Sequence, residues 1–137
     1  MRYLGLDLGR ARIGLALADD VVRTARAHST VSRPSDGAAI QAIGKVARDY
    51  EAERLVLGLP LNMDGSEGPA ARGARAFAAK LGPALDLPVS FQDERLSTFE
   101  ASDRLRAQGV DARAQKALVD AEAAAVILQS WLDGGGA

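Results

Sequence analysis

The chain has 137 residues, of which 47% are apolar and 26% are charged, and its formal net charge is -1. This length and composition predict one globular domain, and the net charge does not by itself indicate a nucleic-acid partner. The chain has no cysteine, which excludes disulfides, thiolate metal sites and a cysteine nucleophile. Most of the cations are arginines, which suit phosphate recognition. A composition rich in arginine and alanine can also reflect a biased base composition of the genome.

The first part of the chain predicts three consecutive strands. Residues 2–8 predict a buried strand, residues 9–11 a tight turn, and residues 12–19 the antiparallel partner of the first strand. Residues 22–32 predict a third antiparallel strand, and an amphipathic helix follows over about 36–51. Because no signal peptide precedes the first strand and no apolar run could span a bilayer, we expect a cytoplasmic protein without membrane contact.

The rest of the chain alternates between strands and helices. We predict strands at 55–59 and 88–92, and helices at about 69–81, 97–109 and 114–132. Three strands followed by this alternation indicate an α/β protein with a mixed sheet covered by helices. We expect a single domain over residues 1–133 and a disordered tail over 134–137.

Acidic residues stand at three places where the local pattern favours apolar residues. Asp7 lies between two leucines in the first strand, Asp93 and Glu94 follow the strand at 88–92, and Asp120 begins an apolar helical segment. A buried, unpaired carboxylate is costly, so such groups are usually neutralised, paired or bound to a metal. If the fold brings these acids together, they make a site for a hard cation and the chain is a metal-dependent enzyme.

Each acid also has a simpler interpretation. These are a strand end for Asp7, a solvated ion pair with Arg95 for Asp93 and Glu94, and a helix start favoured by the helix dipole for Asp120. Adjacent strand residues point to opposite faces, so only one of Asp93 and Glu94 can readily face Asp7. The residue pattern does not choose between them.

Other polar positions carry weaker signals. Residues 58–68 join a strand end to a helix start, which predicts either a flexible substrate loop or a plain connection, and they lack the Gly-Lys-Ser/Thr element of a P-loop. His28 is the only histidine and is expected to be a strand residue without a chemical role. Glu122 is expected to be solvated rather than a ligand.

Four motifs follow one another along the chain. They are Gly5-Leu6-Asp7-Leu8-Gly9 with Arg12-Ile13-Gly14-Leu15-Ala16, then Gly58-Leu59-Pro60-Leu61-Asn62-Met63-Asp64-Gly65, then Asp93-Glu94-Arg95-Leu96-Ser97-Thr98, and Val119-Asp120-Ala121. In this order and spacing they make nearly the whole chain resemble the YqgF/RuvX family of Holliday junction resolvases and pre-16S rRNA nucleases. Ser97 stands where that family usually has threonine, and it keeps the hydroxyl group.

The resemblance implies a ribonuclease H-like fold with a five-stranded sheet in the order 3-2-1-4-5, its first three strands antiparallel and helices on both faces. It also implies that Asp7, Glu94 and Asp120 converge as catalytic residues and as ligands of Mg²⁺ or Mn²⁺, with Asp93 the less favoured ligand. Oxygen ligands without cysteine suit these cations. We expect substrate contacts from Arg10, Arg12, Asn62 and Arg95.

The function implied is that of a divalent-metal-dependent endonuclease acting on structured nucleic acid. The favoured substrate is the 5′ end of pre-16S rRNA, in ribosome biogenesis. The alternative is a Holliday junction resolvase of DNA recombination that cuts branched DNA as a homodimer. Two further classes are a non-catalytic RNA-binding adaptor and an ATPase of the actin and sugar-kinase type, although the latter needs two domains and 137 residues supply one.

Overall fold

The computed structural model describes residues 1–94 and 112–135, with side chains described outside 112–118. The strands are β1 (Arg2–Leu8), β2 (Arg12–Asp19), β3 (Arg26–Ser32), β4 (Arg54–Leu59) and β5 (Val89–Asp93). They form one sheet in the order β3-β2-β1-β4-β5, in which β1, β2 and β3 pair antiparallel and β4 and β5 continue parallel to β1. The expected mixed sheet and its strand order are confirmed.

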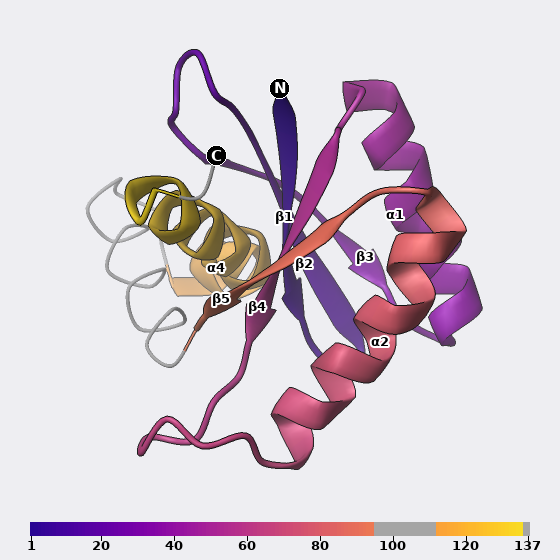
Figure 1. Ribbon diagram of the computed structural model, residues 1–137, viewed down its shortest axis with the longest axis vertical. Coiled ribbons are helices and arrows are strands. Elements are labelled where there is room, and N and C mark those ends of the chain that lie inside the picture. The colour runs from indigo at the N-terminus through magenta and orange to yellow at the C-terminus, as the bar shows by residue number, and fades with distance from the viewer. Residues whose placement is uncertain (95–111, 136–137) are drawn as a thin grey trace.

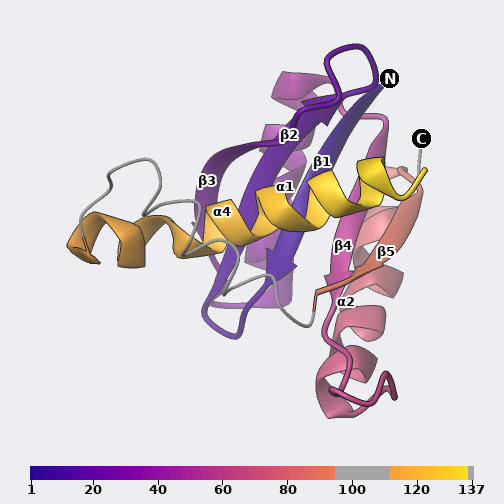
Figure 2. The same cartoon turned by 90° about the vertical axis from the view of Figure 1, so that its left-hand side faces the viewer.

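Helices cover both faces of this sheet. Helices α1 (Asp36–Tyr50) and α2 (Pro69–Leu85) lie on one face, and α4 (Ala112–Asp133) lies on the other (Figure 1). Figure 2 shows α4 crossing the strands rather than running along them. The predicted helix at 97–109 lies outside the described residues. None of the helices in the described ranges is long and apolar enough to cross a membrane.

The alternation of β1 divides its side chains between two cores. Leu4 and Leu6 are buried in the core beneath α1 and α2, whereas Tyr3 is buried in the core beneath α4, where its ring meets Trp131 edge-on. Asp7 belongs to the Tyr3 side because strand residues two apart share a face. Leu8 packs against the α1 and α2 side, so the last two residues of β1 point to opposite faces.

The third strand begins later than the sequence predicts. β3 starts at Arg26 rather than at residue 22, because the Asp19 carboxylate accepts hydrogen bonds from the backbone N–H groups of Val21 and Val22 at 3.0 and 2.7 Å. The two valines are left 86% and 68% exposed in the resulting turn. A side-chain hydrogen bond to the backbone has here replaced strand pairing that β-branched residues favour.

Helix α2 is a turn longer than predicted and ends at Leu85. The extra turn contains Pro83, which removes one helical hydrogen bond, and it packs Leu85 against the core. The helix then ends where Asp86 adopts the left-handed conformation, with φ 54°. After α4, Gly134 and Gly135 form a hydrogen-bonded turn, and residues 136–137 lie outside the described residues, so the disordered tail over 134–137 stays a prediction.

Helix α4 approaches the sheet so closely that three strands carry glycine beneath it. A Cβ atom at Gly5 of β1 would lie 2.8 Å from the Leu128 Cβ, and one at Gly58 of β4 would lie 2.6 Å from the Ile127 Cδ1. A Cβ atom at Gly14 of β2 would overlap the backbone carbonyl of Asp120. Glycine is therefore required at Gly5 and Gly14 for the helix to lie where it does, whereas a Cβ at Gly58 would displace the ends of the Glu94 and Ile127 side chains.

The segment of α4 above these glycines is buried around its circumference. Every residue from 121 to 128 is buried, including Glu122, whose side chain is 5% exposed. The expectation that Glu122 is solvated is therefore wrong. The small alanine side chains around Glu122 allow neighbouring segments to pack closely against the helix.

We expect Gly14→Ala to lower the free energy of unfolding by about 1–3 kcal/mol, because the added methyl group must displace the Asp120 backbone. Gly73→Ala in α2 is the matched control, since a Cβ there meets nothing within 4 Å, and it should raise stability by about 0.4–1 kcal/mol. Urea denaturation of the two variants measures both effects. A Gly14→Ala protein as stable as wild type would contradict the close seating of α4.

Candidate active site

Asp7 lies between two glycines on neighbouring strands. Its partner across β2 is Gly14, and the parallel pairing of Leu6 with Leu57 places Gly58 beside it on β4. Laterally paired residues point to the same face of a sheet, so both neighbours of the Asp7 side chain lack a side chain of their own. This leaves room above the sheet on either side of one carboxylate.

The other two predicted acids occupy that room. The Asp120 backbone lies over Gly14, and the Glu94 carboxylate lies over Gly58, with its Oε2 atom 2.6 Å from where a Cβ would be. Glu94 reaches this position because its backbone N–H donates to the Leu59 carbonyl at 3.3 Å, which carries the pairing of β5 with β4 one residue further. Three elements distant in sequence thus bring Asp7, Glu94 and Asp120 to one end of the sheet.

Asp7 and Glu94 form a hydrogen-bonded acid pair. Burial, the hydrogen bond to Asp7 and the nearby charges of Asp7 and Asp93 raise the pKa of Glu94 from 4.5 to about 9. Burial and the charge of Asp120 also raise the pKa of Asp7, while the hydrogen bond from Glu94 opposes that rise. At neutral pH the Glu94 carboxyl therefore keeps its proton and donates a hydrogen bond to the Asp7 carboxylate.

Asp120 is turned toward an arginine instead. Its Oδ2 atom accepts a hydrogen bond from Arg12 Nε at 2.7 Å, and Arg12 itself is 60% exposed. In this conformation no group of three or more histidine and acidic side chains among the described residues is arranged to hold a metal ion. Asp120 lies near the acid pair but is ion-paired with Arg12. It would have to break that ion pair before it could contact Asp7 or Glu94.

Asp93 takes the opposite direction from Glu94, as strand alternation requires. Asp93 pairs with Leu59 at the end of β5 and is exposed, and it influences the acid pair through its charge. Of the two adjacent acids, Glu94 is the one whose side chain contacts Asp7. The assignment of metal-binding roles to these acids stays a prediction.

The residues predicted to contact substrate are dispersed. Arg12 lies at the acids, whereas Arg10 follows β1 and lines a cleft beside α2. Asn62 is exposed, and its side-chain amide donates to the Ser66 hydroxyl at 3.0 Å. Arg95 lies outside the described residues.

The loop that carries Asn62 is closed by its own hydrogen bonds. The Asn62 backbone donates to the Ser66 carbonyl at 2.9 Å, and the Asp64 carboxylate accepts from both the N–H and the hydroxyl of Ser66. Glu67, at the end of the loop, makes a two-point ion pair with Arg75 of α2. The structure therefore shows an internally bonded loop, in which Asn62 shapes the loop from within.

Gly14 and Gly58, which create the space that the acids occupy, were not among the predicted site residues. A signal was present, because an isolated glycine within an apolar strand often marks a close backbone approach. Three such glycines on consecutive strands of a predicted sheet would have indicated the path of a covering helix. They contribute shape rather than chemistry.

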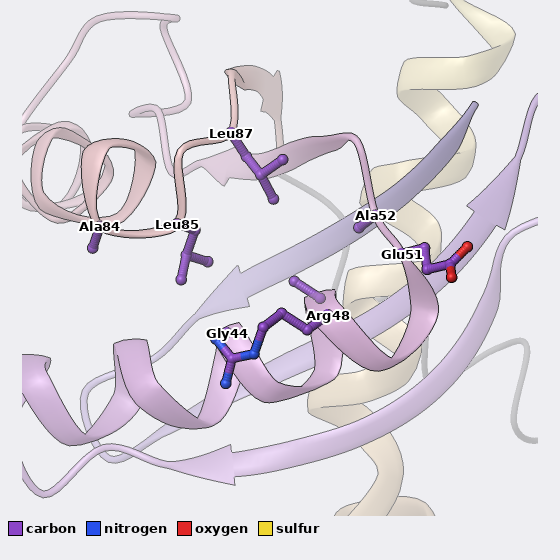
Figure 3. Close-up of a pocket in the computed structure, with 8 residues that line it drawn as sticks. Gly44, Arg48, Glu51, Ala52, Ala84, Leu85 and Leu87 are labelled. Carbon is purple, nitrogen blue, oxygen red and sulfur yellow. The ribbon is translucent and has the colours of Figure 1, made fainter.

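A separate hollow of about 210 Å³ lies between the C-terminal ends of α1 and α2 (Figure 3). Its walls are mostly apolar, and Figure 3 shows Leu85 and Leu87 pointing into it while the Arg48 side chain extends along α1 toward Gly44. None of the predicted site residues lines it. The candidate site is therefore the acid pair at the other face.

The strand order, the crossing helix and the acids at the end of β1 define a ribonuclease H-like fold of the type found in resolvases. T. thermophilus RuvC in complex with a Holliday junction substrate has this fold, with a TM-score of 0.63, 16% identity, and coverage of 99% of this chain and 97% of RuvC. The Fowlpox virus resolvase bound to Holliday junction DNA has it too, with a TM-score of 0.61, 10% identity and 98% of each chain covered. Identities this low show the fold alone.

Sequence comparison identifies the family. The model of the RuvX family, described as Holliday junction resolvase, matches residues 1–134. A relative from Anaeromyxobacter sp. (strain K), named "Putative pre-16S rRNA nuclease", is 64% identical over 133 residues, which cover 97% of each protein. The chain belongs to the RuvX family, and the resemblance seen in its motifs is confirmed.

We expect the metal-free protein to lose stability as the pH rises from about 5 to 9. The folded-state pKa of Glu94, about 9, lies above its ordinary 4.5, so the stability gained from the bound proton is complete at low pH and is lost as the pH approaches 9. Glu94→Gln should remove this loss and make the protein more stable than wild type at pH 8. Urea unfolding in EDTA across this pH range measures it.

Asp49→Asn, at an exposed position of α1, is the control for removing one carboxylate elsewhere. It should leave the slope of stability against pH close to that of wild type. A Glu94→Gln protein that is less stable than wild type at pH 8 would contradict a protonated Glu94.

Proposed function

We propose that this protein is a divalent-metal-dependent endonuclease that hydrolyses phosphodiester bonds in structured nucleic acid, and that its substrate is the 5′ end of pre-16S rRNA. Its membership of the RuvX family and the name carried by its relative at 64% identity support the substrate. The observation that carries the chemistry is the buried pair of Asp7 and Glu94 with Asp120 at its side. We further propose that the protein acts in the cytoplasm.

The acid pair fits a bound cation because the pair is otherwise held together by a proton. Two carboxyl groups in contact cannot both ionise cheaply, and a divalent cation relieves that repulsion when it replaces the shared proton. Carboxylate oxygens without sulfur or imidazole suit Mg²⁺ or Mn²⁺. We assign the ligands as Asp7, Glu94 and Asp120, and the exposure of Asp93 supports its place as the less favoured ligand.

The chain's own residues divide the remaining work. Bound divalent cations supply activation of water and stabilisation of the leaving oxygen. Arg12, which is tied to Asp120 by a 2.7 Å hydrogen bond, becomes available to a substrate phosphate when Asp120 turns toward the acid pair. The bonded loop at residues 62–66 lies after β4 and presents a fixed surface beside the strand ends rather than a mobile cover.

The second candidate function is cleavage of four-way DNA junctions. The family description as Holliday junction resolvase favours it. Symmetric cutting of two strands requires two active sites, so this function needs a homodimer. The acid site is the same for both functions, and the substrate and the oligomeric state separate them.

We expect Mn²⁺-dependent cleavage of precursor rRNA by the wild-type protein and none in EDTA. Asp7→Asn, Glu94→Gln and Asp120→Asn should each lower the rate by roughly a hundredfold or more, because each removes an ionisable ligand. Asp93→Asn, whose side chain points away from the pair, is the matched neighbour control and should retain most of the activity. Gel assays with precursor rRNA and a four-way junction measure cleavage.

The outcomes separate the alternatives. Cleavage of the junction but not of the RNA, by a dimer, would favour the resolvase. Metal-dependent cleavage that survives all three substitutions would overturn the site assignment. Binding of RNA without cleavage of either substrate would favour a non-catalytic adaptor.

A further inference from the structure

A cleft of about 580 Å³ opens beside the C-terminal ends of β1 and β4, on the face of the sheet that α1 and α2 cover. Leu8 and Arg10 line it from the end of β1, and Pro69 and Gly73 line it from the first turns of α2. Arg33, just after β3, completes the wall. Ligands of open α/β sheets bind outside the carboxyl ends of the strands, which is where this cleft lies.

The charged side chains that line the cleft are both arginines. Arg10 is exposed and makes no polar contact with another side chain in the described part of the chain. Arg33 is held in place: its guanidinium bonds to Asp36 at 2.9 Å and to the Gly9 carbonyl at 2.8 Å, and it stacks on the Phe77 ring with the centroid at 4.9 Å. A fixed guanidinium loses little conformational entropy when it binds a ligand.

The surroundings of the cleft compensate its positive charge only in part. Asp36 accepts from Lys80 at 3.1 Å as well as from Arg33, so one carboxylate serves two cations. Among the described residues, α2 has no side-chain cap at its N-terminus and no acid in its first turn. The positive end of the helix dipole therefore adds to the two arginines.

We propose that this cleft binds a backbone phosphate of the nucleic-acid strand whose cleavage the acid pair carries out. The inference rests on the proposed function for the identity of the strand. Asp7 and Leu8 are adjacent, and they point to opposite faces at the end of β1, the first toward Glu94 and the second into the cleft. A strand that crosses this end of the sheet contacts both places, so the cleft fixes the strand while the acids meet the bond to be cut.

The test uses Gly73, because a side chain can be added there without disturbing the fold. Gly73 is exposed in α2, lines the cleft, and has nothing within 4 Å of an added Cβ. Gly73→Glu places a negative charge in the cleft, Gly73→Gln adds the same bulk without charge, and Gly73→Arg adds a positive charge. Ala79→Glu, at an exposed position later in α2, is the control for net charge.

Binding of a short fluorescent single-stranded RNA is measured by anisotropy in EDTA, so that no cleavage occurs. We expect Gly73→Glu to weaken binding by about threefold to tenfold relative to Gly73→Gln, Gly73→Arg to strengthen it, and Ala79→Glu to leave it within about twofold of wild type. Arg10→Ala should also reduce the slope of log affinity against log salt by about 0.7, the value for one phosphate contact on a single strand. Thermal unfolding verifies that each variant is folded.

Equal binding by the Glu, Gln and Arg variants at position 73, with an unchanged salt slope for Arg10→Ala, would overturn the inference. Equal weakening by Glu and Gln would overturn it as well, because bulk and not charge would then matter. The proposed function can fail separately. If the wild-type protein cleaves nothing with Mn²⁺ present but the variants show the expected order of binding in EDTA, the phosphate cleft stands and the nuclease function is contradicted.

Discussion

The close seating of α4 on the sheet is the constraint on which the rest of the molecule depends. Glycines on β1, β2 and β4 leave no side chain of their own between the sheet and α4, so the helix packs closely against these strands. That contact buries one face of the sheet and also fixes the position of Asp120 relative to Asp7. Packing and site geometry are therefore one requirement, and a change that relaxes the helix also moves an acid.

The closeness of the acids raises their electrostatic free energy, and the structure lowers it in two different ways. Glu94 keeps a proton and donates a hydrogen bond to Asp7, so the buried pair carries one negative charge instead of two. Asp120 instead pairs with the exposed guanidinium of Arg12. A site designed only for stability would not place these acids together, and such local conflicts with folding are expected where a protein binds a ligand.

Sequence patterns predicted the strands and the sheet well because alternation and apolar runs record burial directly. They were wrong where one interaction overrode the pattern: the Asp19 carboxylate delayed β3, and burial of Leu85 carried α2 past Pro83. The acids were recognised as carboxylates in apolar segments. Their convergence was predicted from the family resemblance, because the local sequence does not show which strands lie side by side in a sheet. The burial of Glu122 was not predicted for a related reason, because it depends on neighbouring segments that no local pattern specifies.

Strand alternation at the end of β1 links the proposed cleavage site with the proposed phosphate cleft. Consecutive residues of a strand point to opposite faces, so Asp7 and Leu8 connect the acid pair beneath α4 with the arginine-lined cleft beneath α2. The turn that follows adds to both: Arg12 returns to Asp120, while Arg10 stays on the side of the cleft and the Gly9 carbonyl fixes Arg33. In the proposed function the acids repel the nucleic-acid backbone, and the cations of this turn, Arg12 beside Asp120 and Arg10 at the cleft, offset that repulsion.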